Sequence, residues 1–333
     1  MITVLQSLNG ALHDLMATDA RVVVIGEDIL DPYGGAFKVT KGLSTRFPDR
    51  VLATPISESA IAGLSVGLAM RGLRPVAEMM FGDFLFLAGD QLVNHAAKFP
   101  WMYNDQVTVP MVVRAPMGAR RGYGPTHSQS IEKHFLGVPG LLVVAPSVVS
   151  SPGDLLKYSV LECGQPVLFI ENKTCYGRPL VPDIAGMTSS MIVDDAHPFP
   201  TVWLRHDGSD GADAVLWCYG GMVPHCLDAV ATLRDGEGLL VDLAVVSQLS
   251  PVPASHVERI VRDSGTSVFA YAEEASTEHG WGAELLAQAA AHAGHASHVR
   301  IGGRAAPIPS SRAQEAAAVP QASDIVASLL EHF

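Results

Sequence analysis

The chain has 333 residues, of which 48% are hydrophobic and 17% are charged, a balance typical of a folded globular protein rather than a disordered or fibrous one. Its 22 basic and 34 acidic residues give a formal net charge of −12, which argues against nucleic acid as the main partner. Because single hydrophobic cores stop growing near ~250–300 residues, this length favours two domains.

The first residues do not combine a positively charged leader with an apolar core, and no apolar run reaches the ~18 residues that a membrane span needs. We therefore expect neither a signal peptide nor a transmembrane helix. The four cysteines are widely spaced without a Cys-x-x-Cys pair, which is typical of buried thiols in a reducing cytoplasm: Cys163, Cys175, Cys218 and Cys226.

In the first half of the chain, short apolar runs alternate with helical patterns, which predicts βαβ units, a parallel sheet and an α/β fold. Strands are expected at residues 22–27, 75–80, 111–114, 141–144 and 167–170. Helices are expected to begin near Ser57, Phe84 and Pro152.

Glu58 follows the run Thr-Pro-Ile-Ser and opens a predicted helix of mostly small and apolar residues. Two opposing influences act on a carboxylate in this position: desolvation disfavours its charge, while the helix dipole and the backbone amides favour it. A carboxylate balanced in this way is a candidate acid or base. On these residues alone, a first-turn glutamate that only complements the helix dipole fits equally well.

Two later segments carry further candidates. The corner at residues 81–91 is rich in aromatic side chains, and its Phe84 could stack on a planar heterocycle or simply fill the core. The glycine-rich loop at residues 122–130 carries His127 among hydroxyl and amide side chains. Histidine exchanges protons near neutral pH and glycine permits close approach to a ligand, although a solvated loop histidine fits the same pattern.

The alternation of elements breaks down between residues 179 and 211, where prolines and glycines gather and the run Asp-Gly-Ser-Asp-Gly occurs at 207–211. We therefore predict a first domain at residues 1–185, a linker at 186–208 and a second domain at 209–333. Within the linker only residues 201–204 resemble a strand. In the second domain, strands are expected at 214–217, 239–243 and 268–271, and helices at 223–233, 254–261, 282–292 and 323–331.

Several signatures of ligand sites are missing from this pattern. No Gly-x-Gly-x-x-Gly follows the first predicted strand, and no Gly-Lys-Ser/Thr phosphate loop occurs. The sequence also has no His-Glu-x-x-His and no Cys/His cluster with ligand spacing, so it predicts no catalytic metal.

Taken together, the segments resemble the beta subunit of the thiamine-diphosphate-dependent 2-oxo acid dehydrogenases, of the pyruvate and branched-chain type within the transketolase-like group. The resemblance is carried in order by residues 26–28, 34–43, 54–58, 72–78, 83–84, 90–94, 96–98, 127–130, 139–141 and 282–284. It implies two open α/β domains, a pyrimidine-binding domain and a transketolase-type C-terminal domain.

The resemblance also implies that thiamine diphosphate is shared between two chains, with its diphosphate and Mg²⁺ held by a separate alpha subunit. This division accounts for the lack of a Gly-Asp-Gly with a downstream Asn in the present chain. Glu58 matches the family glutamate that hydrogen-bonds the aminopyrimidine ring and activates the cofactor, and Phe84, Ile56 and Glu27 fall at its cofactor-binding positions. His127 matches the histidine at the substrate end, with a role in proton handling or acyl transfer.

Two departures from the family pattern leave questions open. Arg120 and Arg121 stand where many members have small residues, and they could be exposed charges or could meet a phosphorylated or carrier-bound acyl group. The loop that binds a structural K⁺ in the family reads Glu-Cys-Gly-Gln at residues 162–165. Backbone carbonyls could still bind an ion there, so a structural potassium remains an open expectation.

The expected function is that of the beta subunit of an α₂β₂ heterotetramer. Such an enzyme decarboxylates a 2-oxo acid, pyruvate or a branched-chain one, and transfers the acyl group to a lipoylated transacylase. One alternative is a specialised two-carbon or acyl transferase that loads a carrier protein. Another is a non-catalytic partner subunit, against which the presence of Glu58 and His127 counts, because packing alone needs neither group.

Overall fold

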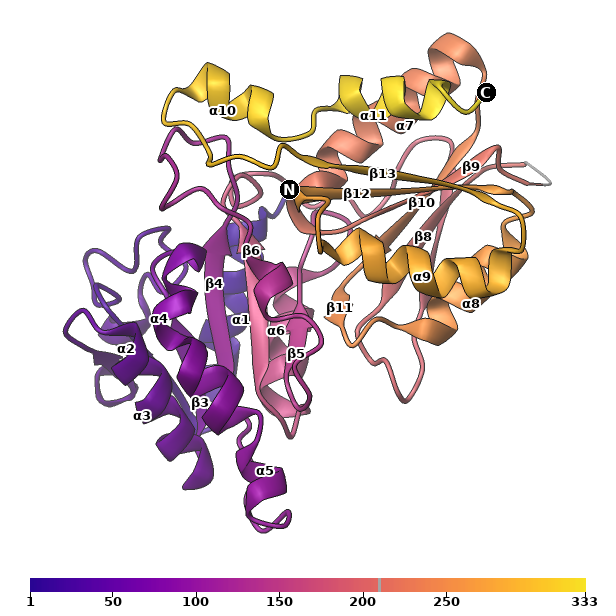
Figure 1. The fold of residues 1–333 in the computed structure, drawn as a ribbon. Coiled ribbons are helices and arrows are strands. Elements are labelled where there is room, and N and C mark those ends of the chain that lie inside the picture. Colours follow the sequence, from indigo (N-terminus) through magenta and orange to yellow (C-terminus); the bar gives the residue numbers. More distant parts are fainter. Residues whose placement is uncertain (209–210) are drawn as a thin grey trace.

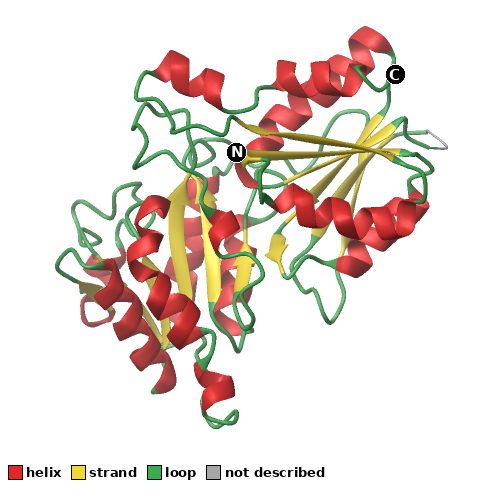
Figure 2. Cartoon of the chain, viewed as in Figure 1, coloured by secondary structure: helices red, strands yellow, loops and turns green. Residues whose placement is uncertain are grey.

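The computed structural model describes residues 1–208 and 211–333, which form two α/β units that lie side by side, each built on its own sheet (Figures 1 and 2). The prediction of two open α/β domains is confirmed. Residues 209–210, which include the middle of the predicted 207–211 turn and the predicted start of the second domain, lie outside the described residues.

The first sheet has seven strands in the order β11-β5-β6-β4-β3-β1-β2. All neighbours pair in parallel except β11, which runs antiparallel to β5. The strands are β1 (Val22–Gly26), β2 (Val51–Ala53), β3 (Arg74–Glu78), β4 (Val112–Met117), β5 (Leu142–Val144), β6 (Val167–Asn172) and β11 (Gln248–Ser250).

Helices cover both faces of this sheet (Figure 2). They are α1 (Val4–Thr18), α2 (Leu43–Arg46), α3 (Glu58–Met70), α4 (Leu85–Asp90), α5 (Phe99–Met102) and α6 (Pro152–Leu161). Successive strand residues point to opposite faces, so Val24 packs in the cluster that contains α1 and α6, while Ile25 packs in the cluster that contains α3 and α4. Because both faces are buried, these strands read as continuous apolar runs in the sequence.

The second sheet has six strands in the order β13-β12-β9-β10-β8-β7. They are β7 (Met187–Ile192), β8 (Thr201–His206), β9 (Ala214–Cys218), β10 (Val241–Val246), β12 (Val268–Ser276) and β13 (Ser297–Gly303). Its helices are α7 (Val223–Glu237), α8 (Ala254–Asp263), α9 (Trp281–Ala293), α10 (Arg312–Ala318) and α11 (Ala322–Leu330). The helices α7 and α11 cover one face, and α8 and α9 cover the other (Figure 1).

The segment at residues 186–208 differs from the linker that the sequence predicts. It holds β7 and β8, which pair with each other and, through β8, with β10 in antiparallel fashion. Only two residues of β7 are buried, so its polar, proline-flanked sequence resembles a connection. Conversely, β11 comes from the second half of the sequence but pairs with β5 in the first sheet.

Two expectations about the whole chain can be compared with the structure. Within residues 1–208 and 211–333, no helix has both the length and the apolar character required to cross a bilayer. All four cysteines are buried and carry free thiols.

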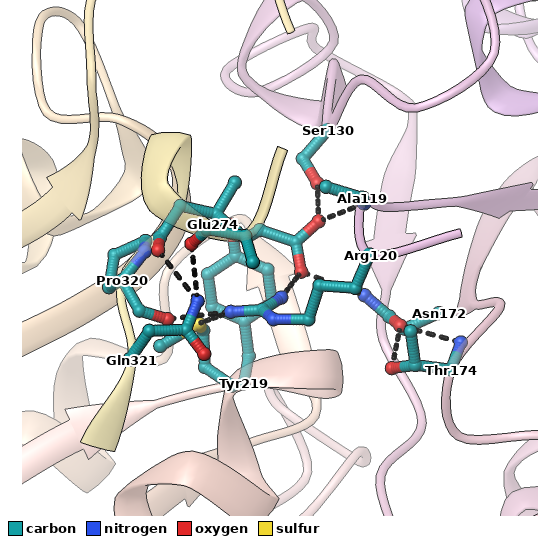
Figure 3. Close-up of polar contacts among 12 residues, drawn as sticks. Ala119, Arg120, Ser130, Asn172, Thr174, Tyr219, Glu274, Pro320 and Gln321 are labelled. Atoms are coloured by element: carbon teal, nitrogen blue, oxygen red, sulfur yellow. Dashed lines mark hydrogen bonds and ion pairs between the residues drawn. The ribbon is translucent and has the colours of Figure 1, made fainter. Parts of the chain in front are cut away.

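Arg120 and Glu274 join the two units (Figure 3). Glu274, on β12, is ion-paired with the Arg120 guanidinium and accepts hydrogen bonds from Ala119 N at 2.7 Å and Ser130 Oγ at 2.9 Å. Arg120 also donates to the carbonyl of Pro320 at 2.6 Å. Burial alone would raise the pKa of Glu274, but Arg120 and these donors hold it below its ordinary value. Arg120 is therefore an internal residue, neither a solvated charge nor a free site for an acyl carrier.

Replacing Arg120 should separate this role from that of a surface charge. In Arg120→Met the carboxylate of Glu274 stays buried without its cation, and we expect the free energy of unfolding to fall by about 3–5 kcal/mol. Equilibrium urea unfolding measures the loss. The control is Arg262→Met on α8, where the side chain is 65% exposed and the expected loss is below about 1 kcal/mol. Equal losses in the two variants would contradict the interpretation.

Candidate functional site

The residues predicted from the sequence gather at one edge of the first sheet. Glu27 follows β1, Glu58 follows β2, Phe84 follows β3 and His127 follows β4. These four strands are neighbours and run parallel, so their carboxyl ends meet at the same edge, where ligands bind in open α/β sheets. Strands lie about 4.8 Å apart, which puts the ends of β2 and β4 roughly 14 Å apart. The edge therefore has two ends with different side chains.

The first end is acidic and formed by Glu58 and Glu27. Glu58 is the first residue of α3, is 5% exposed, and follows the N-cap Ser57, whose hydroxyl accepts a hydrogen bond from Ala60 N. Burial, followed by the charges of Glu58 and Asp28, raises the pKa of Glu27. The two buried carboxyl groups are thus close enough to influence each other, which is the arrangement found around functional acids and bases.

Two buried oxygens at this end have no hydrogen-bond partner within the chain: Glu27 Oε2 and Thr54 Oγ1. Buried polar atoms are usually hydrogen-bonded, so unpaired ones indicate a missing partner. Ile56 lies between Thr54 and Glu58 in the chain and is 82% exposed. An amine-bearing heterocycle would supply both the polar partners and an apolar face for such a site.

The second end is aromatic and basic. Phe84 and His127, which are far apart in sequence, lie with their ring centroids 5.3 Å apart and their planes 80° apart. Phe81 contacts both rings, with its centroid 4.8 Å from that of His127. The Nδ1 atom of His127 lies 3.0 Å from the hydroxyl of Thr126. The structure therefore brings Phe84 and His127 into one cluster.

Lys173 also lies at this aromatic and basic end of the site, although it was not predicted from the sequence. Its side chain is buried, its ammonium donates a hydrogen bond to the carbonyl of His127, and it lies 5.1 Å from the centroid of Phe81. Burial lowers the pKa of Lys173 to about 8, against the opposing charges of Asp83 and Glu274. A charged residue directly after the apolar strand β6 was the signal that could have found it.

Asp83 holds the same loop from the other side. Its Oδ1 accepts hydrogen bonds from Gln129, at 2.8 Å from the side-chain amide and 3.3 Å from the backbone amide. Its Oδ2 is buried without a partner in the chain. The loop that carries His127 is thus tied to residues that follow β3 and β6.

A buried ionic network lies beneath the edge and was also missed. Arg114 on β4 donates to Glu171 through two hydrogen bonds of 2.7 Å and to Glu78 through one of 2.6 Å. Tyr176 donates to Glu171 at 2.6 Å. A Cβ atom on Gly35, which has φ 81°, would lie 2.5 Å from Glu78 Oε1, so only glycine fits beside this network.

Two other sequence features lie outside the candidate site: a stretch with the spacing of a nucleophile elbow, and the loop expected to bind potassium. Gly-Leu-Ser-Val-Gly at residues 63–67 has the spacing of a nucleophile elbow, but Ser65 is buried inside α3 and its hydroxyl donates to Ile61 O at 2.8 Å. In the loop at 162–165, the Cys163 carbonyl accepts a hydrogen bond of 2.9 Å from the Arg74 guanidinium. A structural potassium in this loop stays a prediction.

Comparisons with known proteins agree with this fold. Residues 1–179 match the family model "Transketolase, pyrimidine binding domain", and residues 205–325 match "Transketolase, C-terminal domain". A solved structure titled "Split gene transketolase, inactive beta4 tetramer" is similar in fold, with a TM-score of 0.74 and 20% identity over 99% of this chain and 97% of that one. The two domain matches and the fold define a chain of the transketolase-like class.

The similar proteins narrow the class further. Pyruvate dehydrogenase E1 component subunit beta-2 of Oryza sativa subsp. japonica is 34% identical over 98% of this chain and 84% of its own length. The acetoin:2,6-dichlorophenolindophenol oxidoreductase subunit beta of Cupriavidus necator is 35% identical over 97% and 94%. The 3-methyl-2-oxobutanoate dehydrogenase subunit beta of Mycobacterium tuberculosis is 34% identical over 86% and 78%. The chain belongs to the family of 2-oxo acid dehydrogenase E1 beta subunits.

The acidic end of the site can be tested without a cofactor. Glu58→Gln removes the nearby negative charge, so the pKa of Glu27 should fall while burial still holds it above its ordinary value. Carboxyl ¹³C NMR titration of glutamate-labelled protein measures it, with the resonance assigned by its loss in Glu27→Gln. The exposed Glu331→Gln is the control. An unchanged titration of Glu27 in Glu58→Gln would show that the two carboxyl groups are not coupled.

Proposed function

We propose that the chain is the beta subunit of a thiamine-diphosphate-dependent enzyme that decarboxylates a 2-oxo acid and transfers the acyl group to the lipoyl group of a transacylase. The observation that carries this proposal is the placement of Glu58, Phe84 and His127 at one sheet edge in a chain of this family. The named relatives include subunits of both pyruvate and branched-chain enzymes, which supports a 2-oxo acid as substrate.

The residues at the acidic end suit the aminopyrimidine part of thiamine diphosphate. Glu58 and Glu27 would accept hydrogen bonds from its nitrogen-bound protons, and Glu27 Oε2 would gain the partner that it lacks within the chain. Phe84 and the exposed Ile56 would pack against its rings. When bound, the cofactor supplies carbanion stabilisation for the decarboxylation. Glu58 would hydrogen-bond a pyrimidine nitrogen and could exchange a proton with it.

The aromatic and basic end suits the substrate. His127 presents an imidazole that could donate a proton or a hydrogen bond to a carboxylate or a developing oxyanion. Lys173 fixes the backbone of His127 and adds positive charge behind it below a pH of about 8. Phe81 and Phe84 flank the imidazole and exclude water from one side of it.

The surface beside the edge supports the proposal of an alpha subunit. Four large apolar side chains that follow β2 and β3 are more than half exposed: Ile56, Leu64, Phe86 and Leu87. Exposed apolar groups gathered in this way mark interaction surfaces. We propose that an alpha subunit covers them and supplies the diphosphate and Mg²⁺ sites, because the present chain has no Gly-Asp-Gly with a downstream Asn.

The proposal also covers the acceptor of the acyl group and the cellular compartment of the enzyme. Arg120 is engaged with Glu274, and Arg121 donates a hydrogen bond of 3.1 Å to the Lys173 carbonyl. These contacts weaken the case for a carrier-protein acceptor, so a lipoylated transacylase is the proposed acceptor. The acetoin-oxidising relative makes acetoin a second candidate substrate. Free buried thiols are consistent with a reducing compartment such as the cytoplasm, whereas the rice relative is named as mitochondrial.

Activity of the complex tests the role of Glu58. The chain is co-expressed with its alpha partner, and decarboxylation of pyruvate, branched-chain 2-oxo acids and acetoin is measured with an artificial electron acceptor. Glu58→Gln should lower turnover by about 10²–10⁴-fold without loss of assembly, since a proton-transfer group contributes about that factor. Glu331→Gln is the matched control. Normal turnover in Glu58→Gln would overturn the assignment.

His127→Gln tests the other end of the site. Gln keeps a hydrogen-bonding side chain but cannot exchange a proton, so turnover should fall by about 10²-fold or more while thiamine diphosphate binding is retained. Calorimetric titration of the complex with the cofactor separates the two effects. His292→Gln, on the exposed end of α9, is the control. Loss of cofactor affinity instead of turnover would place His127 in cofactor binding.

A further inference from the structure

Three metal-binding side chains meet in the second unit, away from the residues of the candidate site. Asp194 and His197 lie in the loop between β7 and β8, and His256 lies in the first turn of α8. One donor atom of each residue lies within 4.8 Å of the others. This is the one group of three or more such residues found among residues 1–208 and 211–333.

The two separations between the carboxylate and the imidazoles are close to those around a small tetrahedral ion. Asp194 Oδ1 is 3.1 Å from His197 Nδ1, and Asp194 Oδ2 is 3.6 Å from His256 Nε2. Zinc binds nitrogen and oxygen ligands at about 2.0–2.1 Å, and tetrahedral angles at those lengths put neighbouring ligand atoms about 3.3–3.4 Å apart. The Asp194 carboxylate therefore lies at ligand-to-ligand separation from both imidazoles.

His256 supplies an independent indication of a missing ligand. The residue is fully buried, and its Nε2 has no hydrogen-bond partner in the chain. Its other ring nitrogen, Nδ1, lies 3.0 Å from the hydroxyl of Thr201. When Thr201 accepts the Nδ1 proton, Nε2 carries the lone pair. This pattern, in which the remote nitrogen is held by an oxygen, is usual for a metal-bound histidine.

Hydrogen bonds within the chain satisfy only some of the polar atoms of these three residues. Asp194 accepts hydrogen bonds from the Ser255 hydroxyl and from the backbone amide of His197, the latter at 2.7 Å, and its Oδ1 lies 3.1 Å from the Nδ1 atom of His197, within hydrogen-bond distance. These contacts order the loop without an ion. They leave Nε2 of His256 buried without a hydrogen-bond partner, 3.6 Å from Asp194 Oδ2.

We propose that Asp194, His197 and His256 bind one Zn²⁺ ion, with the Ser255 hydroxyl or a water molecule as the fourth ligand. Two histidines and a carboxylate are donors that zinc commonly takes. Ser255 Oγ is 3.2 Å from His197 Nδ1, at ligand separation from it. The sequence analysis found no such site because the ligands come from segments some 60 residues apart without a recognisable spacing motif.

The ion would fasten the β7–β8 loop to α8 and, through the loop, support the contact between the two units. Phe199, in the same loop, is buried and packs against Tyr158 of α6 with ring centroids 5.3 Å apart. Ser247 N also donates to Pro200 O at 3.1 Å. The role inferred for the metal is structural, and none of its ligands belongs to the candidate functional site.

Metal titration of the intact protein tests the proposal. The full-length chain, with its alpha partner if that is needed for solubility, is stripped with a chelator and titrated with Zn²⁺ and Co²⁺. We expect one ion per chain, an intense visible spectrum of tetrahedral Co²⁺, and a higher melting temperature with Zn²⁺. No added ion per chain, or the weak spectrum of an octahedral site, would overturn the proposal.

Variants locate the ion. Asp194→Asn keeps the shape of the side chain and its hydrogen-bonding capacity, and His197→Ala removes a partly exposed ligand, so both should fold. Each should weaken Co²⁺ binding by at least about 100-fold, since even outer partners of a metal site contribute 10–100-fold. His292→Ala is the matched control and should bind as the unaltered chain does. Equal affinity in all four proteins would show that the metal binds elsewhere.

Discussion

Arg114 lies at the centre of the first sheet with its guanidinium shared between Glu171 and Glu78. Three charged groups have been removed from water here, and their attraction compensates that cost only while the hydrogen-bond geometry is kept. The three side chains belong to β3, β4 and β6, so the network fixes the relative positions of those strands near their carboxyl ends. The segments that carry Phe84, His127 and Lys173 all start from there.

The loop that carries His127 is also held by the second unit. Glu274 on β12 binds the backbone or side chains of Ala119, Arg120 and Ser130, on both sides of this loop. Gly122 N donates to Glu315, from α10. The position of His127 therefore depends on how the two units dock, although the residue itself belongs to the first. This dependence gives a physical reason for the presence of the pyrimidine-binding and C-terminal domains together on this chain.

The two ends of the site differ in what surrounds their polar groups, although both contain buried polar atoms without a partner in the chain. Around His127, Asp83 and Lys173 form hydrogen bonds with the loop and the aromatic rings pack on one another, while Asp83 Oδ2 and Ser128 Oγ are buried without a partner in the chain. Around Glu58, buried oxygens lack partners and the neighbouring surface is apolar and exposed. A chain that leaves these groups uncovered is consistent with a site finished by a ligand and a second subunit, as we propose.

Local sequence patterns were sufficient to predict most strands of the first sheet and the candidate residues that it carries. The strands at residues 22–27 and 167–170 are recognisable because parallel strands buried on both faces form continuous apolar runs. Glu58 is recognisable at the start of a helix of small and apolar residues, and His127 is recognisable in a glycine-rich loop. The helix α1 was missed although its capping box at Thr3 and Gln6 and its buried Leu8, Leu12 and Leu15 carry a local signal.

The sequence by itself determined the α/β class, the family and the position of Glu58, Phe84 and His127 at strand ends. These features depend on hydrophobic periodicity and secondary-structure propensity, which are set by residues close together in the chain. Only the tertiary structure decided that Glu27 lies near Glu58, that Lys173 supports His127, that Arg120 joins Glu274, and that Asp194 meets His256. It also decided that residues 187–192 and 201–206 join the second sheet as β7 and β8. Each of these depends on strand register and domain docking, which bring together residues far apart in the chain and leave no local pattern.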